Sequence, residues 1–465
     1  MLLNKILNQL ENNKFILIFG IIFLSLLFIA SIHFRGGAYL QSESQSFILN
    51  YLDNRPVLQK IFDIQKNDWG FYQARELSYF FDMLDANFIK ISINFGFPHF
   101  YSLIYYLGLV IILFVTAKIV GNFIGLKSPL IVLLLFSLFL TAPAVFFSGI
   151  FFRTGKILSS VFLILILYLI LQQLSPKNKK LSLLLLPLSF LMSISDRQGH
   201  FFLLAITFIF FALWAFTRKK TYKRFFILFL FSSLIALLYD YYLGPSIIKR
   251  ITGVQPNIIF MRPDFLTYTR QDPRWIISNL WLKLWSFVID SLLFILDTFS
   301  YFLGNTHLFI IVLALVFGFV AIFKSKKKEI FLLLLLSFFL VFIMTFFMLI
   351  KQPQMVWPGI RRIYYAFPLN LFILLFSSLA INQFIRFWPK TKVLLVFTLT
   401  TMLFLNIISL PNHYQIIRYS VESDEYKVHE YSPRLFHCLK NSSNPESFYR
   451  LPKEVENVCS QLRKK

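Results

Sequence analysis

Apolar runs of about 20 residues recur along the whole chain, and they constrain its fold more than any other feature. A helix of that length is long enough to cross the ~30 Å hydrocarbon core of a bilayer. Hydrophobic residues make up 57% of the 465 residues, and mean hydropathy is +0.68. The sequence therefore predicts an all-α polytopic membrane protein. Because no small-residue cleavage pattern follows the first run, it is expected to remain as a span.

The net charge of +24 indicates orientation in the membrane. Most of the cations stand in short gaps between apolar runs: Lys118, Lys127, Lys177, Lys179, Lys180, Arg218, Lys219, Lys220, Lys223, Arg224, Lys324, Lys326, Lys327, Lys328, Arg386, Lys390 and Lys392. This is the positive-inside pattern. It favours cytoplasmic loops over nucleic-acid binding as the reason for the charge.

If the basic gaps are cytoplasmic, the chain has about eleven transmembrane helices, its N-terminus inside and its C-terminus outside. The spans are expected at 15–33, 98–117, 128–147, 157–174, 181–195, 200–217, 225–243, 307–323, 330–350, 366–385 and 392–410. Residues 1–410 then form the membrane-embedded domain, with large external loops at 34–97 and 244–306, and residues 411–465 form a short external tail.

Two features of the external face have open interpretations. Residues 276–303 are apolar enough to span, yet their polar side chains fall on one helical face, which favours an amphipathic helix on the outer surface over a further span. Cys438 and Cys459, the only cysteines, both lie in the tail. They form a disulfide on an oxidising face or remain two thiols.

The first external loop concentrates acids. A short helix is expected over 72–89, and Asp82 and Asp85, three residues apart, can converge on one ligand. The candidate catalytic acids are Glu43, Asp68, Glu76, Asp82 and Asp85. One of them is suited to act as a general base, and others to hold a divalent cation, Mg²⁺ or Mn²⁺, at Asp82 and Asp85. The alternative is a solvated amphipathic helix with local ion pairs.

Several cations stand beside span ends on the predicted outer face, where positive-inside predicts few. Arginine matches phosphate geometry, and Tyr364 can stack on a sugar. The candidate substrate- and phosphate-binding residues are Arg75, Arg153, Lys156, Asp196, Arg197, Arg361, Arg362 and Tyr364. Interfacial snorkelling is the alternative reading.

This arrangement of spans, acidic first loop and external cations resembles the GT-C superfamily of membrane glycosyltransferases, which includes protein O-mannosyltransferases, oligosaccharyltransferases and the aminoarabinose transferase of lipid A. The family's Asp-Glu or Asp-x-Asp signature is not intact. Glu43 in SES stands nearest the expected first acidic site, and FFDMLDANF offers Asp82 and Asp85 at a wider spacing.

The resemblance implies a glycosyltransferase at the outer face of a bacterial cytoplasmic (inner) membrane. Its donor would be a polyprenyl-phosphate sugar, its acceptor a glycan, lipid or protein, and membrane lipid would surround it, with no role for nucleic acid. A transporter or flippase of lipid-linked glycans, a polymerase or ligase of another fold, and a membrane scaffold are the alternatives.

Overall fold

The computed structural model describes residues 14–34, 51, 55–64, 72–94, 102–142, 145, 154–174, 184–256, 316, 332–337 and 367–424. Every regular element in these ranges is helical, which confirms the all-α class. The apolar helices are α2 (Lys14–Phe34), α7 (Leu103–Ile119), α8 (Pro129–Thr141), α10 (Thr154–Leu174), α11 (Leu185–Ser193), α12 (Arg197–Thr217), α13 (Lys220–Leu238), α19 (Phe367–Phe387) and α20 (Lys392–Asp424). The other elements are α4 (Val57–Ile61), α6 (Glu76–Asn94), α14 (Gly244–Thr252), the π-helical segments η1 (Val120–Ile124) and η3 (Tyr239–Leu243), and the 3-10 turn η6 (Pro389–Thr391).

Six described helical segments are long and apolar enough to cross a membrane. They are Leu103–Ile124, Ile157–Leu174, Arg197–Thr217, Lys220–Thr252, Phe367–Phe387 and Pro389–Pro411. Phe15–Ser31 and Pro129–Thr141 are shorter apolar helices. In the described part of the expected span 181–195, the helix is the nine-residue α11, about 14 Å long. The expected spans 307–323 and 330–350 lie mostly outside the described residues. The structure therefore supports a multi-pass protein without establishing eleven spans.

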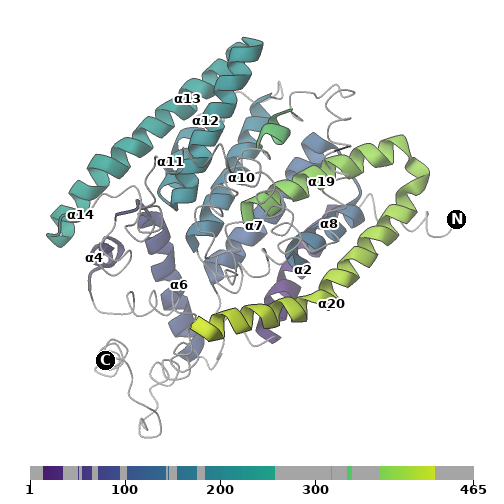
Figure 1. Ribbon diagram of the computed structural model, residues 1–465, viewed down its shortest axis with the longest axis horizontal. Coiled ribbons are helices and arrows are strands. Elements are labelled where there is room, and N and C mark those ends of the chain that lie inside the picture. Colours follow the sequence, from purple (N-terminus) through teal and green to yellow (C-terminus); the bar gives the residue numbers. More distant parts are fainter. Residues whose placement is uncertain are drawn as a thin grey trace, which may run out of the picture.

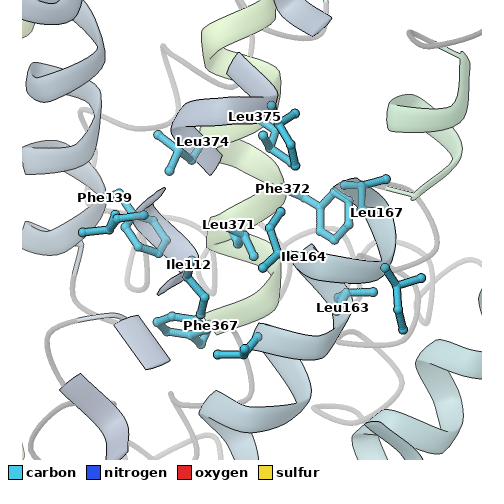
Figure 2. Packing of buried hydrophobic residues seen from close by; sticks show 14 of the residues in the cluster. Ile112, Phe139, Leu163, Ile164, Leu167, Phe367, Leu371, Phe372, Leu374 and Leu375 are labelled. Atoms are coloured by element: carbon cyan, nitrogen blue, oxygen red, sulfur yellow. The ribbon is translucent and has the colours of Figure 1, made fainter. Parts of the chain in front are cut away.

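α19 lies at the centre of the bundle, and nearly all its residues are buried. Phe372 packs with residues of α10, while Phe367 approaches Phe139 of α8 at a ring-centroid distance of 5.7 Å (Figure 2). α13 and α20 lie at the periphery, where few residues of their apolar stretches are buried. Close packing of this kind is what holds helices together in lipid, where water exclusion contributes little.

Hydrogen bonds identify the two ends of the bundle. At one end, Asn382 near the end of α19 donates to the carbonyl of Ile124 at 2.7 Å. At the other, the amide of Leu77 in α6 donates to the carbonyl of Ile194, which follows α11, at 3.3 Å. The first end carries the cations of the loops after α7, α12 and α19, and the second end carries α6. The bundle is therefore polarised by charge along its axis.

α13, η3 and α14 form one unbroken helix from Lys220 to Thr252, with α4 and α6 near its α14 end (Figure 1). These 33 residues measure about 50 Å, whereas the hydrocarbon core is ~30 Å thick. The helix is therefore long enough to cross the membrane and extend beyond it at the α6 end.

Candidate functional site

The helix of the first loop begins at Glu76, four residues later than the expected range 72–89, and runs to Asn94. Ala74 causes the difference, because its φ of 47° is left-handed and interrupts a right-handed helix. Arg75 consequently lies in the turn before α6 and does not share a helical face with Tyr79 and Asp82.

The acids of α6 point inward. Glu76, Asp82 and Asp85 are 7%, 9% and 3% exposed, whereas Phe80 and Phe88 on the same helix are 37% and 40% exposed. A helix in water would show the opposite pattern. The described part of the acidic loop is therefore not a solvated amphipathic helix, and its carboxylates lie among polar groups of the bundle.

The turn before α6 meets the turn between α11 and α12. Arg75 Nε lies 3.5 Å from Asp196 Oδ2, with the two side chains 14% and 4% exposed. Asp196 also caps α12, because its Oδ1 accepts a hydrogen bond from the amide of Gln198 at 2.9 Å. Two segments selected separately from the sequence are thus in contact, although about 120 residues separate them.

Glu76 lies beside two tyrosines. Its carboxylate interacts with the phenols of Tyr72, in the turn before α6, and Tyr239, the first residue of η3. Burial raises the pKa of Tyr72 well above its ordinary value, and the neighbouring Glu76 carboxylate raises it further. Tyr72 therefore stays protonated at any physiological pH and can act only as a neutral hydrogen-bonding group.

Arg197, the first residue of α12, completes the cluster. It interacts electrostatically with Asp240 of η3 and with His200, one turn along α12. A π-helical segment such as η3 is uncommon and often occurs at functional sites. We call Tyr72, Arg75, Glu76, Asp196, Arg197, His200, Tyr239 and Asp240 the polar cluster.

Three glycines allow the elements of the polar cluster to approach closely. A Cβ on Gly199 of α12 would lie 1.9 Å from the carbonyl oxygen of Met192, and one on Gly244 of α14 would lie 1.7 Å from the Tyr72 hydroxyl. At Gly155 in the first turn of α10, a Cβ would lie 2.3 Å from Ser78 Oγ. A side chain at any of these positions would force a neighbour to move. Gly155 is the one that contacts α6 itself, Gly244 contacts the turn before α6, and Gly199 lets α12 approach α11.

Asp85 has a different environment. Its Oδ1 accepts from the amide of Ile104 at 3.1 Å, and its Oδ2 accepts from the hydroxyl of Ser102, the N-cap of α7. Asp82 is close enough to raise the pKa of Asp85 by its charge. Among the described side chains no group of three or more His, Cys, Asp or Glu residues is arranged to hold a metal ion. The proposed cation at Asp82 and Asp85 remains a prediction.

The remaining predicted site residues are not placed. Glu43, Asp68, Arg153, Arg361, Arg362 and Tyr364 lie outside the described residues, as do Cys438, Cys459 and the range 276–303. Lys156 lies in α10, one residue after Gly155, and its side chain is not described. The structure thus brings together Arg75, Glu76, Asp196 and Arg197 of the predicted set.

His200, Tyr239 and Asp240 were not predicted from the sequence. Asp240 carried a usable signal, because it is an acid near the end of the apolar run 225–243, where charge is costly and commonly functional. Tyr239 and His200 carried none, since aromatic residues are frequent at span ends in any membrane protein.

The structure also describes an apolar cavity that contains no member of the polar cluster. Its lining comes from α10, α12, α19 and residues 332–337, and includes Leu163, Phe202, Phe210, Leu333 and Phe372.

Comparisons with models of protein families and with curated proteins give no match to this chain.

Proposed function

We propose that this protein is a glycosyltransferase that moves a sugar from a polyprenyl-phosphate donor to an envelope acceptor at the outer face of a bacterial cytoplasmic membrane. The observation that carries the proposal is the contact between the start of α6, which carries Glu76, and the turn that precedes Arg197, at the end of the bundle opposite the clustered lysines. A carboxylate and a guanidinium in one cluster at a helix end suit a reaction that deprotonates an alcohol and releases a phosphate. The resemblance to the GT-C superfamily supplies the substrate class.

Glu76 acts as the general base in this proposal. Its carboxylate takes the proton of the acceptor hydroxyl while the hydroxyl oxygen forms a bond to the anomeric carbon of the sugar. The bond between that carbon and the phosphate oxygen breaks, and polyprenyl phosphate leaves with the electron pair. Arg197 binds the departing phosphate, where a preorganised cation lowers the barrier most effectively.

Glu76 is favoured over the other described acids by its surroundings. Both oxygens of Asp85 accept hydrogen bonds that cap α7, so this residue has a structural role already. Asp82 points inward but belongs to the Asp85 side of α6, two helical turns from Arg75. Glu76 is the described acid of the first loop that adjoins both Arg75 and η3.

Transport is less well supported than transfer. Transporters usually bind charged substrates near the middle of the membrane. Most charged residues of the polar cluster stand at the start of α6 or α12, although Asp240 lies inside the helix Lys220–Thr252. The cavity between α10, α12 and α19 is lined almost entirely by apolar side chains.

The test compares Glu76→Gln with a matched control, Asp63→Asn, which removes a carboxylate from the Arg55–Asp63 ion pair beside α4. Purified protein is given lipid-linked sugars extracted from a deletion strain, and release of polyprenyl phosphate is measured. We expect Glu76→Gln to lower the rate about 10²- to 10⁴-fold, the usual contribution of a general base, and Asp63→Asn to leave it unchanged.

Full transfer by Glu76→Gln together with a loss in Asp82→Asn would move the base to Asp82. Full transfer by both variants would exclude this chemistry from the described loop. Movement of intact lipid-linked glycan across vesicles, without bond cleavage, would favour the flippase alternative, and glycan chain growth without release of polyprenyl monophosphate would favour a polymerase or ligase.

A further inference from the structure

Arg75 and Asp196 form an ion pair between two segments that are far apart in the sequence. Arg75 precedes α6, and Asp196 precedes α12, with Nε to Oδ2 at 3.5 Å. The neighbouring backbone repeats the connection, because the Leu77 amide donates to the Ile194 carbonyl at 3.3 Å. The contacts that hold the start of α6 on the α11–α12 turn thus include an ion pair and a main-chain hydrogen bond.

The two carboxylate oxygens of Asp196 have different partners. Oδ1 caps α12 through the Gln198 amide, and Oδ2 meets Arg75. The cap fixes the orientation of the carboxylate, so Oδ2 is presented to Arg75 at little further cost in side-chain entropy. Both oxygens of Asp196 are therefore already engaged within the protein.

Close packing beside the ion pair makes its position critical for the polar cluster. Ser78, in the first turn of α6, lies against Gly155 of α10. A Cβ added at Gly155 would also lie 2.9 Å from the Ser195 carbonyl oxygen. Glu76 lies between Arg75 and this contact. A shift of the start of α6 would therefore carry Glu76 away from Tyr239.

We infer that Arg75 and Asp196 are a positioning pair that holds α6 on the bundle with Glu76 turned toward η3, and that neither binds the substrate phosphate. This assignment replaces the phosphate-binding role predicted for both residues, and for catalysis it rests on the proposed function. The docking of α6 is independent of any reaction and can be measured by itself.

The first experiment measures docking. Ser78→Cys, in a chain whose Cys438 and Cys459 are serine, places a thiol at the buried contact with Gly155, where Ser78 is 5% exposed. A water-soluble maleimide should label it slowly. Adding Arg75→Gln or Asp196→Asn should raise the labelling rate at least tenfold. Asp196→Asn keeps an oxygen to cap α12, so it removes the ionic contact alone. Arg55→Gln breaks the more exposed Arg55–Asp63 pair and should not change labelling.

The second experiment measures transfer with the same variants. Displacement of Glu76 should lower kcat at least tenfold and leave the donor KM within twofold, and Arg75→Lys, which keeps the charge, should recover part of both kcat and thiol protection. A large rise in donor KM with normal thiol protection would overturn the inference and return both residues to substrate binding. Unchanged labelling and unchanged kcat would also overturn it. If the unmodified protein transfers no sugar, the proposed function fails, while labelling still decides whether the pair docks α6.

Discussion

Asp85 has a structural role that its position in an acidic segment of the sequence does not indicate. It lies in α6 but caps α7, accepting from the Ile104 amide and the Ser102 hydroxyl. Ser102 in turn accepts from the Tyr105 amide at 2.9 Å. The carboxylate therefore satisfies backbone donors that a helix start leaves without partners. At the residue scale, an acid in the first loop is not by itself evidence of catalysis.

Asp85 should give the stability a measurable pH dependence. Burial raises its pKa from 3.8 to about 7, with a smaller contribution from Asp82. Because the folded state holds the proton more tightly, this stabilisation is complete below pH 3.8 and is lost as the pH rises to about 7. The Tm of the unmodified protein in detergent should therefore fall between pH 5 and 8 relative to the Tm of Asp85→Asn. The corresponding difference in unfolding free energy is on the order of 1.4 kcal/mol per pH unit up to pH 7.

Asp85→Asn is the matched comparison because the amide keeps an oxygen for Ile104 and has no proton to lose. The other titrating groups are common to both proteins, so their contribution cancels in the difference. Parallel Tm curves for the two proteins would show that Asp85 does not change its proton affinity on folding.

Sequence reasoning found individual site residues more readily than their partners. Glu76 stands out as an acid of the first loop, and Arg197 as a cation beside a span end on the predicted outer face. The pairing of Arg75 with Asp196 depends on how α6 docks on the α11–α12 turn, which no local pattern encodes. The same holds for Tyr239, beside Glu76, and for Asp240, beside Arg197, because their positions follow from the extension of α13 through η3.

At the scale of elements, the apolar runs located the helices well and their ends less well. α7, α10, α12 and α19 coincide with predicted spans to within about five residues. α20 departs most, because it continues past the expected end at 410 to Asp424, with Pro411 inside the helix. Hydropathy measures burial in lipid, whereas a helix ends where caps and left-handed residues interrupt its hydrogen bonds.

The pair α12 and α13 illustrates how helices associate here. Phe210 of α12 is fully buried and lies 4.9 Å from the ring of Phe225 and 5.6 Å from that of Phe229, both on α13. Thr207 and Ser233 add a hydrogen bond of 3.1 Å between the helices. Aromatic packing and one polar contact replace the water exclusion that drives helix association in soluble proteins.

Phe210→Ala should destabilise the protein by about 3 kcal/mol. This is the lower end of the range for Phe→Ala in soluble cores, because the loss is of packing and not of burial from water. Phe208→Ala is the matched control, since Phe208 is on the same helix and 63% exposed. The measurement is thermal unfolding in detergent. Equal losses in the two variants would contradict the observed packing of α12 on α13.

At the scale of the whole molecule, one end of the bundle is basic, and the described acids of the polar cluster lie at the other end. The described cations of one end are Lys118, Lys127, Arg218, Lys219, Lys220, Lys223, Arg224, Arg386, Lys390 and Lys392, and no acid occurs in the described loops that carry them. The acids of α6, the α11–α12 turn and η3 gather at the opposite end. Membrane proteins retain lysine and arginine on the cytoplasmic side. The polar cluster is therefore expected at the external surface.

Cysteine labelling in cells would test this orientation. Lys219 and Lys390 are exposed at the basic end, and Ser246 in α14 is exposed at the opposite end. In a chain whose Cys438 and Cys459 are serine, a membrane-impermeant maleimide should label Ser246→Cys in intact cells. It should label Lys219→Cys and Lys390→Cys only after permeabilisation. The reverse result would place the polar cluster in the cytoplasm, where an acceptor would have to come from inside the cell.

Labelling of Lys219→Cys and Lys390→Cys from different sides would contradict the antiparallel arrangement of the bundle, because both positions lie at the same end in the structure.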